Sequence, residues 1–193
     1  MIELLGTINI PDQLLEYLKT AKPSRVSSQL AGKSFVQQIK LLAADRCVDN
    51  YKFYTESNTG TIEFQEEWFK DIVPGEFLKQ HGFSYPINAV VLQVQPGHFT
   101  APHRDRYIRT VFAYEQNVLF DDIVRLWIPV EDSKFGQALF VESDVIHNFQ
   151  QGQVYHFDNY DFHSAANAGL DHRYTLIVYC KSVARLQQNA DLT

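Results

Sequence analysis

The sequence predicts a mainly β protein, a sandwich or barrel that includes the jelly-roll class, preceded by helical segments. From residue 86 onward, apolar and polar residues tend to alternate, as in strands with one buried face. Turn-forming stretches such as "QPGH", "DSKFG" and "NAGLDH" separate these short runs. Before residue 85, apolar residues recur instead at the three- and four-residue spacing of a helix. The change of period near residue 85 divides the chain into two parts.

Helical spacing marks three segments of the first part. Residues 11–21, "PDQLLEYLKTA", open with proline and aspartate, which favour helix starts, and carry leucines on one face. Residues 33–46 repeat the pattern. Residues 66–82 are interrupted by Pro74-Gly75, so two short helices are expected there. The runs "NYKFYT" and "TIEFQ", on either side of "ESNTG", predict a hairpin.

Eight short strands are expected in the second part, with turns between most of them. They span residues 87–94, 101–114, 123–130, 137–142, 144–149, 153–158, 161–167 and 173–180. Many short strands with turn signals are typical of sandwiches, barrels and jelly rolls. The 193 residues are expected to form a single domain, with a mostly helical part at 1–85 and a β core at 86–182.

Composition excludes several classes of protein. The formal net charge of −6 argues against a nucleic-acid partner, which would call for a basic surface. No apolar run approaches a membrane span, and the start "MIELLGTINIPDQ" lacks the pattern of a signal peptide, so a cytoplasmic protein is expected. Cys47 and Cys180 are far apart and are expected to be reduced and buried, which excludes a zinc site built from thiolates.

The stretch "TAPHRDRYIRT" contains two candidate metal ligands, His103 and Asp105. Alternate residues of a strand share one face, so both side chains could reach one ion. An iron site with two histidines and one carboxylate needs one more imidazole and leaves positions open for reactants. The candidates for it are His81, His98, His147, His156, His163 and His172. His163 is favoured because it lies in a predicted strand with Arg173 ten positions later.

Arg173 is a candidate binding residue for an anion. An arginine that faces the inside of a barrel is costly unless it meets an anion, and its planar fork suits a carboxylate. Metal ligands near such an arginine indicate a metal-bound acid such as 2-oxoglutarate. A chance set of polar strand residues is the alternative.

The pattern H-x-D, a distal histidine and an arginine ten residues later resembles the Fe(II)- and 2-oxoglutarate-dependent dioxygenases. The stretch "GQVYHFDNYDFHSAANAGLDHR" is similar to the aspartyl/asparaginyl β-hydroxylase branch, which shares G-x-V-x-x-F-D-[DN]-x-x-x-H followed by arginine. The matching positions are Gly152, Val154, Phe157, Asp158, Asn159, His163 and Arg173. The resemblance covers residues 87–180 and implies a double-stranded β-helix, the cupin-like jelly roll, with the N-terminal helices packed on one sheet.

Two features distinguish this chain from that branch. In "RLWIPVED", Arg125 matches an arginine that helps to hold the co-substrate, but Trp127 stands where the branch has histidine. Asp105 is present, whereas the animal peptide hydroxylases of the branch lack this carboxylate. In that respect the chain is more similar to bacterial proline cis-hydroxylases. For Arg125, a structural ion pair with Asp121 or Asp122 is an equal alternative.

The resemblance implies a hydroxylase that uses Fe(II), 2-oxoglutarate and dioxygen to oxidise an aliphatic carbon of an amino acid or peptide residue. His103, Asp105 and His163 would bind the metal, and Arg173, Arg125 and Thr175 the co-substrate. On the residues alone, Arg109 and Trp127 are candidates for substrate contact. Asp158 and Asn159 are expected to shape the turn before His163. The alternatives are a dioxygenase for another small metabolite or a nucleobase, and a non-catalytic barrel that binds a metal or ligand.

Overall fold

The computed structural model describes residues 1–20, 59–62, 72–84, 88–104 and 122–183 of the chain. Its helices are α1 (Asp12–Thr20) and α4 (Gly75–Gln80). Its strands are β1 (Glu3–Thr7), β2 (Thr59–Ile62), β3 (Asn88–Val94), β4 (His98–His103), β5 (Ile123–Pro129), β6 (Gln137–Val141), β7 (Asp144–Ile146), β8 (Gln153–His156), β9 (His163–Asn167) and β10 (Arg173–Lys181). Several predictions lie outside the described residues: the helix at 33–46, the first half of the hairpin, most of the first helical piece of 66–82, and the positions Cys47, Asp105, Arg109 and Asp121.

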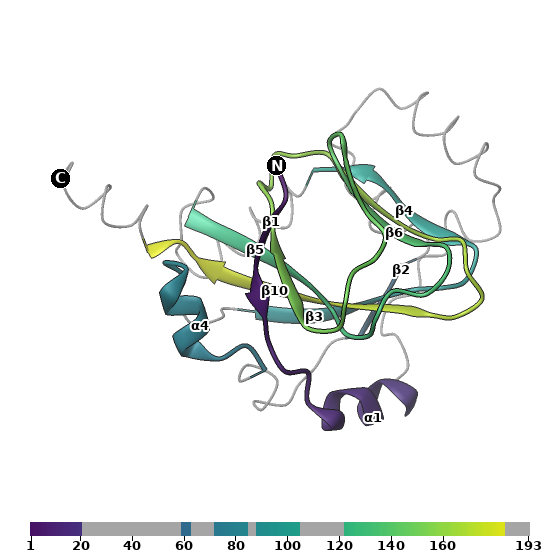
Figure 1. Cartoon of the computed structure of the whole chain (residues 1–193), viewed down its shortest axis with the longest axis horizontal. Helices are drawn as coiled ribbons and strands as arrows, with labels where there is room; N and C mark the ends of the chain where they lie inside the picture. Colours follow the sequence, from purple (N-terminus) through teal and green to yellow (C-terminus); the bar gives the residue numbers. More distant parts are fainter. Residues whose placement is uncertain (21–58, 63–71, 85–87, 105–121, 184–193) are drawn as a thin grey trace.

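The strands form two antiparallel sheets that face each other (Figure 1). The larger has the order β1-β8-β5-β10-β3-β2, and the smaller has the order β4-β9-β6-β7. From β3 to β10 the chain passes from one sheet to the other at each step, except that β6 and β7 form a hairpin within the smaller sheet. Eight strands wound in this way make a jelly roll, so the predicted double-stranded β-helix is confirmed.

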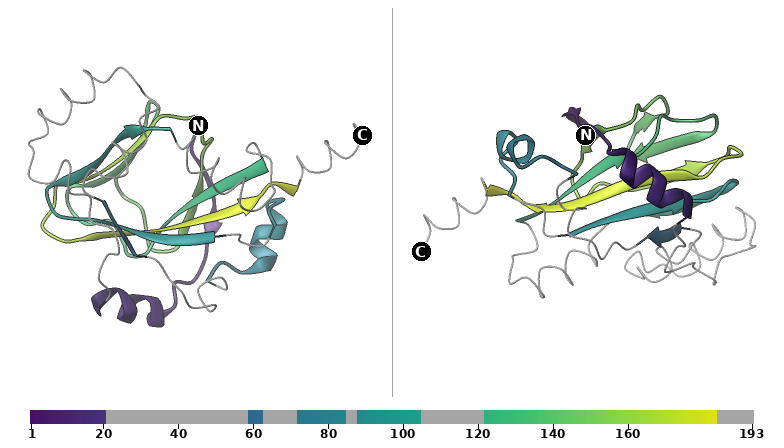
Figure 2. Two further views of the ribbon diagram at one scale, coloured as in Figure 1. Left: turned by 180° about the vertical axis from the view of Figure 1, so that it is seen from behind. Right: turned by 90° about the horizontal axis from the view of Figure 1, so that it is seen from below.

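The N-terminal helices pack on the outer face of the larger sheet, as predicted (Figures 1 and 2). Leu14 and Leu18 are spaced one helical turn apart in α1, and both are buried in the cluster that also contains Leu78 of α4. The facing strand residues of that cluster include Leu126 and Val178. Every residue of β5 is buried, because this strand has the helices on one side and the smaller sheet on the other.

The space between the two sheets is filled by a second, more aromatic cluster. Trp127 lies at its centre, with Phe149 and Tyr155 packed edge-on against the indole at centroid distances of 5.2 and 5.6 Å. Polar side chains are buried among the same inward-facing positions. These buried polar residues include Arg125, His163, Arg173 and Thr175.

The structure corrects three expectations about elements. β1 was not predicted, and it lies at one edge of the larger sheet, with β2 at the other. β2 begins earlier than the expected run "TIEFQ" and pairs with β3. β4 begins at His98 rather than at 101, because Gly97, with φ of 75°, makes a tight turn whose N–H bonds to the Asn167 carbonyl. None of the helices in the described ranges combines the length and the apolar character needed to cross a bilayer.

Candidate functional site

The ends of β4 and β9 bring two predicted metal ligands to one place. His103, the last residue of β4, is the cross-strand partner of His163, the first residue of β9. A register irregularity between Thr100 and His103 precedes this pair. Partners in an antiparallel ladder have Cα atoms only about 4.5–5.5 Å apart. Residues sixty positions apart in the chain are therefore neighbours, while Asp105 lies just beyond the described residues.

The other candidate histidines lie elsewhere. His147 and His172 are exposed, and His98 is at the opposite end of β4, paired with Asn167. His81 is held between α4 and β1, with its ring nitrogens 2.8 and 3.1 Å from the carbonyls of Phe77 and Leu5. His156 lies beside Phe83. Among the described residues, no group of three or more potential metal-binding side chains is assembled.

The hydrogen bonds of His163 define the protonation of its ring. Its Nε2 lies 3.0 Å from Nη1 of Arg125, and a guanidinium can only donate, so Nε2 is the acceptor. The hydrogen of the neutral ring is then on Nδ1, which donates to the Asp161 carbonyl at 3.1 Å. Metal-binding histidines commonly have one nitrogen fixed by a carbonyl in this way while the other presents its lone pair. The ring is thus in a suitable tautomer to bind a metal through Nε2.

Phe157 packs against both members of this pair. Its ring centroid is 5.1 Å from that of His163, and the guanidinium carbon of Arg125 is 5.5 Å from the same aromatic ring. His163 and Arg125 are 3% and 6% exposed, so the contact is made away from water. Arg125 donates a hydrogen bond to this imidazole, and Asp121, one of the two ion-pair partners considered from the sequence, lies outside the described residues.

Arg173 is a second buried cation in the interior of the barrel. It is 3% exposed, and no aspartate or glutamate among the described residues forms an ion pair with it. Its Nη1 donates to the carbonyls of Ala138 and Ala166 at 2.9 and 3.2 Å. Its Nε and Nη2 each lie 3.4 Å from the hydroxyl of Thr175, and its guanidinium carbon is 5.4 Å from the ring of Trp127. Neutral groups alone therefore surround this positive charge in the described structure.

Burial also affects the protonation of this group. Loss of solvation lowers the pKa of the Arg173 guanidinium from its ordinary value to about 10. The side chain is still charged at neutral pH, so the fold maintains a desolvated cation. An arginine in such surroundings is a candidate site for an anion, and its fork matches a carboxylate.

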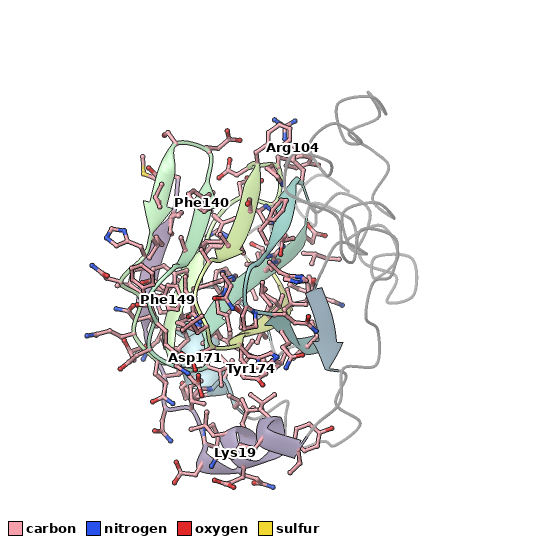
Figure 3. All side chains as sticks on the ribbon, turned by 90° about the vertical axis from the view of Figure 1, so that its right-hand side faces the viewer. Lys19, Arg104, Phe140, Phe149, Asp171 and Tyr174 are labelled. Atoms are coloured by element: carbon pink, nitrogen blue, oxygen red, sulfur yellow. The ribbon has the colours of Figure 1, made fainter. Side chains whose placement is uncertain are left out.

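The two arginines mark two ends of the interior. Arg173 reaches the carbonyl of Ala166, three residues along β9 from His163, and three strand residues span about 10 Å. Trp127 lies between them, two residues after Arg125 on β5 and in contact with Arg173. Figure 3 shows the same separation from outside, with Arg104, next to His103, and Asp171, near Arg173, toward opposite ends of the strands.

Packing and turn geometry explain part of the sequence pattern between Gly152 and Arg173. Gly152 has φ of 76°, and a Cβ there would lie 2.0 Å from the Ile8 carbonyl oxygen. Asp158 accepts a hydrogen bond from the backbone of Tyr160, and Asn159 donates to the Ile123 carbonyl at 3.0 Å. The prediction that Asp158 and Asn159 shape the turn before His163 is confirmed.

Two contacts were not predicted. Arg104, which follows His103, places its guanidinium carbon 4.0 Å from the centroid of the Phe162 ring. Arg125 binds His163 directly. Neither contact is encoded by spacing, since the first depends on the pairing of β4 with β9 and the second on the packing of the two sheets against each other. The available signal for a buried Arg125 was a single charged residue within the otherwise apolar strand IVRLWIP.

The residues present fit a metal ion and an organic acid in part. His163 presents Nε2 with its tautomer fixed by Asp161, and Arg173 supplies a cation without a described anion. The guanidinium of Arg125, however, already occupies the Nε2 position. A metal can bind there only if Arg125 moves.

Comparison with known proteins adds only similarity of fold. No family model matches the sequence, and no curated protein is similar to it. Solved structures that resemble the chain include the cupin domain of Cnp3 from Schizosaccharomyces pombe, with 10% identity over 69% of this chain and 72% of that one, at a TM-score of 0.40. A predicted oxalate decarboxylase from Thermotoga maritima has 10% identity over 64% of this chain and 80% of that one, at a TM-score of 0.38. A cupin barrel protein from Salinispora arenicola has 12% identity over 69% of this chain and 86% of that one, at a TM-score of 0.37. At these scores the assignment of a double-stranded β-helix rests on the strand order itself.

Proposed function

We propose that this protein is an Fe(II)- and 2-oxoglutarate-dependent dioxygenase that hydroxylates an aliphatic carbon of an amino acid or peptide residue. The observation that carries the proposal is Arg173, a buried cation whose described surroundings contain no anion. A cation kept in this state is stabilised when a carboxylate enters. The neighbourhood of His103 and His163, about 10 Å away along β9, supports a metal at the other end of that acid.

Each residue has a defined task in this proposal. His163 binds the metal through Nε2, with the Asp161 carbonyl maintaining the tautomer, and His103 and Asp105 complete the set. Arg173 binds the distal carboxylate of 2-oxoglutarate through its fork, while the Thr175 hydroxyl orients the guanidinium. The large side chains around Trp127 exclude water from the interior.

The bound iron and 2-oxoglutarate would supply the oxidising chemistry, in which dioxygen, 2-oxoglutarate and a C–H bond yield an alcohol, succinate and carbon dioxide. The residues of this chain position the reactants and select the substrate. Arg109 is the candidate contact for an anionic substrate group, and the expected substrates remain free amino acids or short peptides, with no membrane or nucleic-acid partner.

The test is to load the protein with Fe(II) and 2-oxoglutarate without oxygen and to record the weak visible charge-transfer band of the chelate. We expect the band in the wild type, and its loss in His163→Ala and in Asp105→Ala. Fe(II) alone is the control. If the wild type shows no such band, the proposal is wrong. Release of succinate in the presence of oxygen then identifies the substrate among amino acids and short peptides.

A second candidate is a non-catalytic barrel that binds an organic acid without metal. The contact that favours it is the hydrogen bond from Arg125 to Nε2 of His163, which fills a metal position with a protein cation. In that case 2-oxoglutarate or another dicarboxylate would bind with the same affinity in the presence of EDTA. Arg173→Met would abolish this binding, whereas His163→Gln would leave it unchanged. Metal-dependent binding excludes the second candidate.

A further inference from the structure

One hydrogen bond in the barrel joins a proposed metal ligand to a positive charge. Arg125 donates from Nη1 to Nε2 of His163 at 3.0 Å, and both side chains are more than nine-tenths buried. An imidazole nitrogen has a single lone pair in the plane of its ring. It can accept this hydrogen bond or bind a metal, but it cannot do both.

The distances exclude simultaneous occupation. A metal bound to an imidazole nitrogen lies about 2.1 Å from it, along the direction of the lone pair. The Nη1 atom of Arg125 lies 3.0 Å from Nε2. A metal in the same direction would be about 1 Å from the guanidinium, which is shorter than any non-bonded contact. Two positive charges would also meet in a region without solvent.

We propose that Arg125 is a resident cation that occupies the ligand position of His163 in the metal-free protein and must withdraw before a divalent ion binds. The inference rests on the metal centre of the proposed function, but it concerns a different property, the competition between the protein's own cation and the metal. It assigns Arg125 a role in setting metal affinity, as a positioning residue for His163.

The packing around the pair gives this arrangement two consequences. Phe157 contacts the His163 ring and the Arg125 guanidinium together, so the imidazole is held in place before any metal arrives. The binding of a metal to this ordered imidazole therefore loses little free energy in restricting the motion of the ring. Against this, binding must break a hydrogen bond made by a charged donor, which weakens the affinity by about ten- to a hundredfold.

The experiment compares the dissociation constants of Zn²⁺ in the wild type and in Arg125→Met, measured by competition with a chromophoric chelator. Methionine removes the charge and the donor but retains much of the side-chain volume. The matched control is Arg173→Met, which removes the other buried guanidinium about 10 Å away. His163→Gln identifies the part of the binding that uses this ring.

We expect Arg125→Met to bind Zn²⁺ about ten- to a hundredfold more tightly than the wild type, and Arg173→Met to stay within about threefold. Unchanged or weaker binding by Arg125→Met, in a wild type whose binding requires His163, overturns the inference and leaves the metal centre intact. A wild type without His163-dependent binding overturns the metal centre and the inference together.

A second measurement follows the guanidinium groups of the wild type directly. In protein labelled with ¹⁵N-arginine, addition of one equivalent of Zn²⁺ should shift the guanidinium resonances of Arg125 more than those of Arg173. Spectra of the two methionine variants assign the signals. Arg125 resonances that are unaffected while Zn²⁺ binds at His163 would contradict the withdrawal of this side chain.

Discussion

Replacement of Arg173 by methionine should barely change the stability of the ligand-free protein. Burial lowers the pKa of the guanidinium to about 10, more than two below its ordinary value. At about 1.4 kcal/mol for each pKa unit, the folded state disfavours the charged form by about 3 kcal/mol. Methionine removes this cost and leaves the carbonyls of Ala138 and Ala166 without their donor, at about 1 kcal/mol each. The net change in the free energy of unfolding is therefore within about 1 kcal/mol of zero.

The pH dependence follows from the direction of the shift. The folded pKa of Arg173 is below its unfolded value, so the guanidinium is charged in both states at any pH well below 10. The cost of burying the charge is present throughout that range and is relieved only as the pH rises above about 10. The stability difference between the variant and the wild type should therefore be flat from about pH 6 to pH 8.

Urea unfolding followed by circular dichroism measures this difference. In a constant excess of a redox-inert divalent ion, 2-oxoglutarate at a hundred times its dissociation constant should stabilise the wild type by a further amount of about 2.7 kcal/mol, and should add almost nothing to the stability of the variant. A loss of 3 kcal/mol or more in ligand-free Arg173→Met would refute the reasoning. It would mean that neutral groups of the protein already satisfy the charge.

Three further substitutions test individual contacts. Thr175→Val removes the hydroxyl that contacts Arg173 at 3.4 Å, and should weaken 2-oxoglutarate binding by about three- to tenfold while the metal dissociation constant, measured in parallel, stays the same. Gly152→Ala should lower the free energy of unfolding by about 2 kcal/mol or more, because the new Cβ meets the carbonyl of Ile8 and the backbone has positive φ. A change below about 0.5 kcal/mol in urea denaturation would contradict this. Asn159→Ala removes the hydrogen bond that Asn159 donates to the carbonyl of Ile123 and should cost about 1–2 kcal/mol in the same assay, and an unchanged midpoint would show that the turn holds without it.

Strand positions in the second part were largely readable from the sequence. The runs expected at 123–130 and 173–180 correspond closely to β5 and β10, because a glycine-containing turn follows the first and precedes the second, and their residues are suited to sheets. The edge strand β1 was missed for a physical reason. Its side chains are mostly exposed or half-buried, so it carries little hydrophobic pattern, and its pairing with β8 stabilises it.

The sequence by itself determined the local chemistry: a jelly-roll pattern of strands, His163 with Arg173 ten residues later, and turn residues such as Asp158 and Asn159. These follow from propensity and spacing over short distances along the chain. The tertiary structure alone decided which residues meet across the sheets. His103 pairs with His163 because β4 and β9 are neighbours, and Arg125 reaches the same imidazole from the opposite sheet. Contacts between distant segments depend on register and on which face of a strand is buried, and no local pattern carries that information.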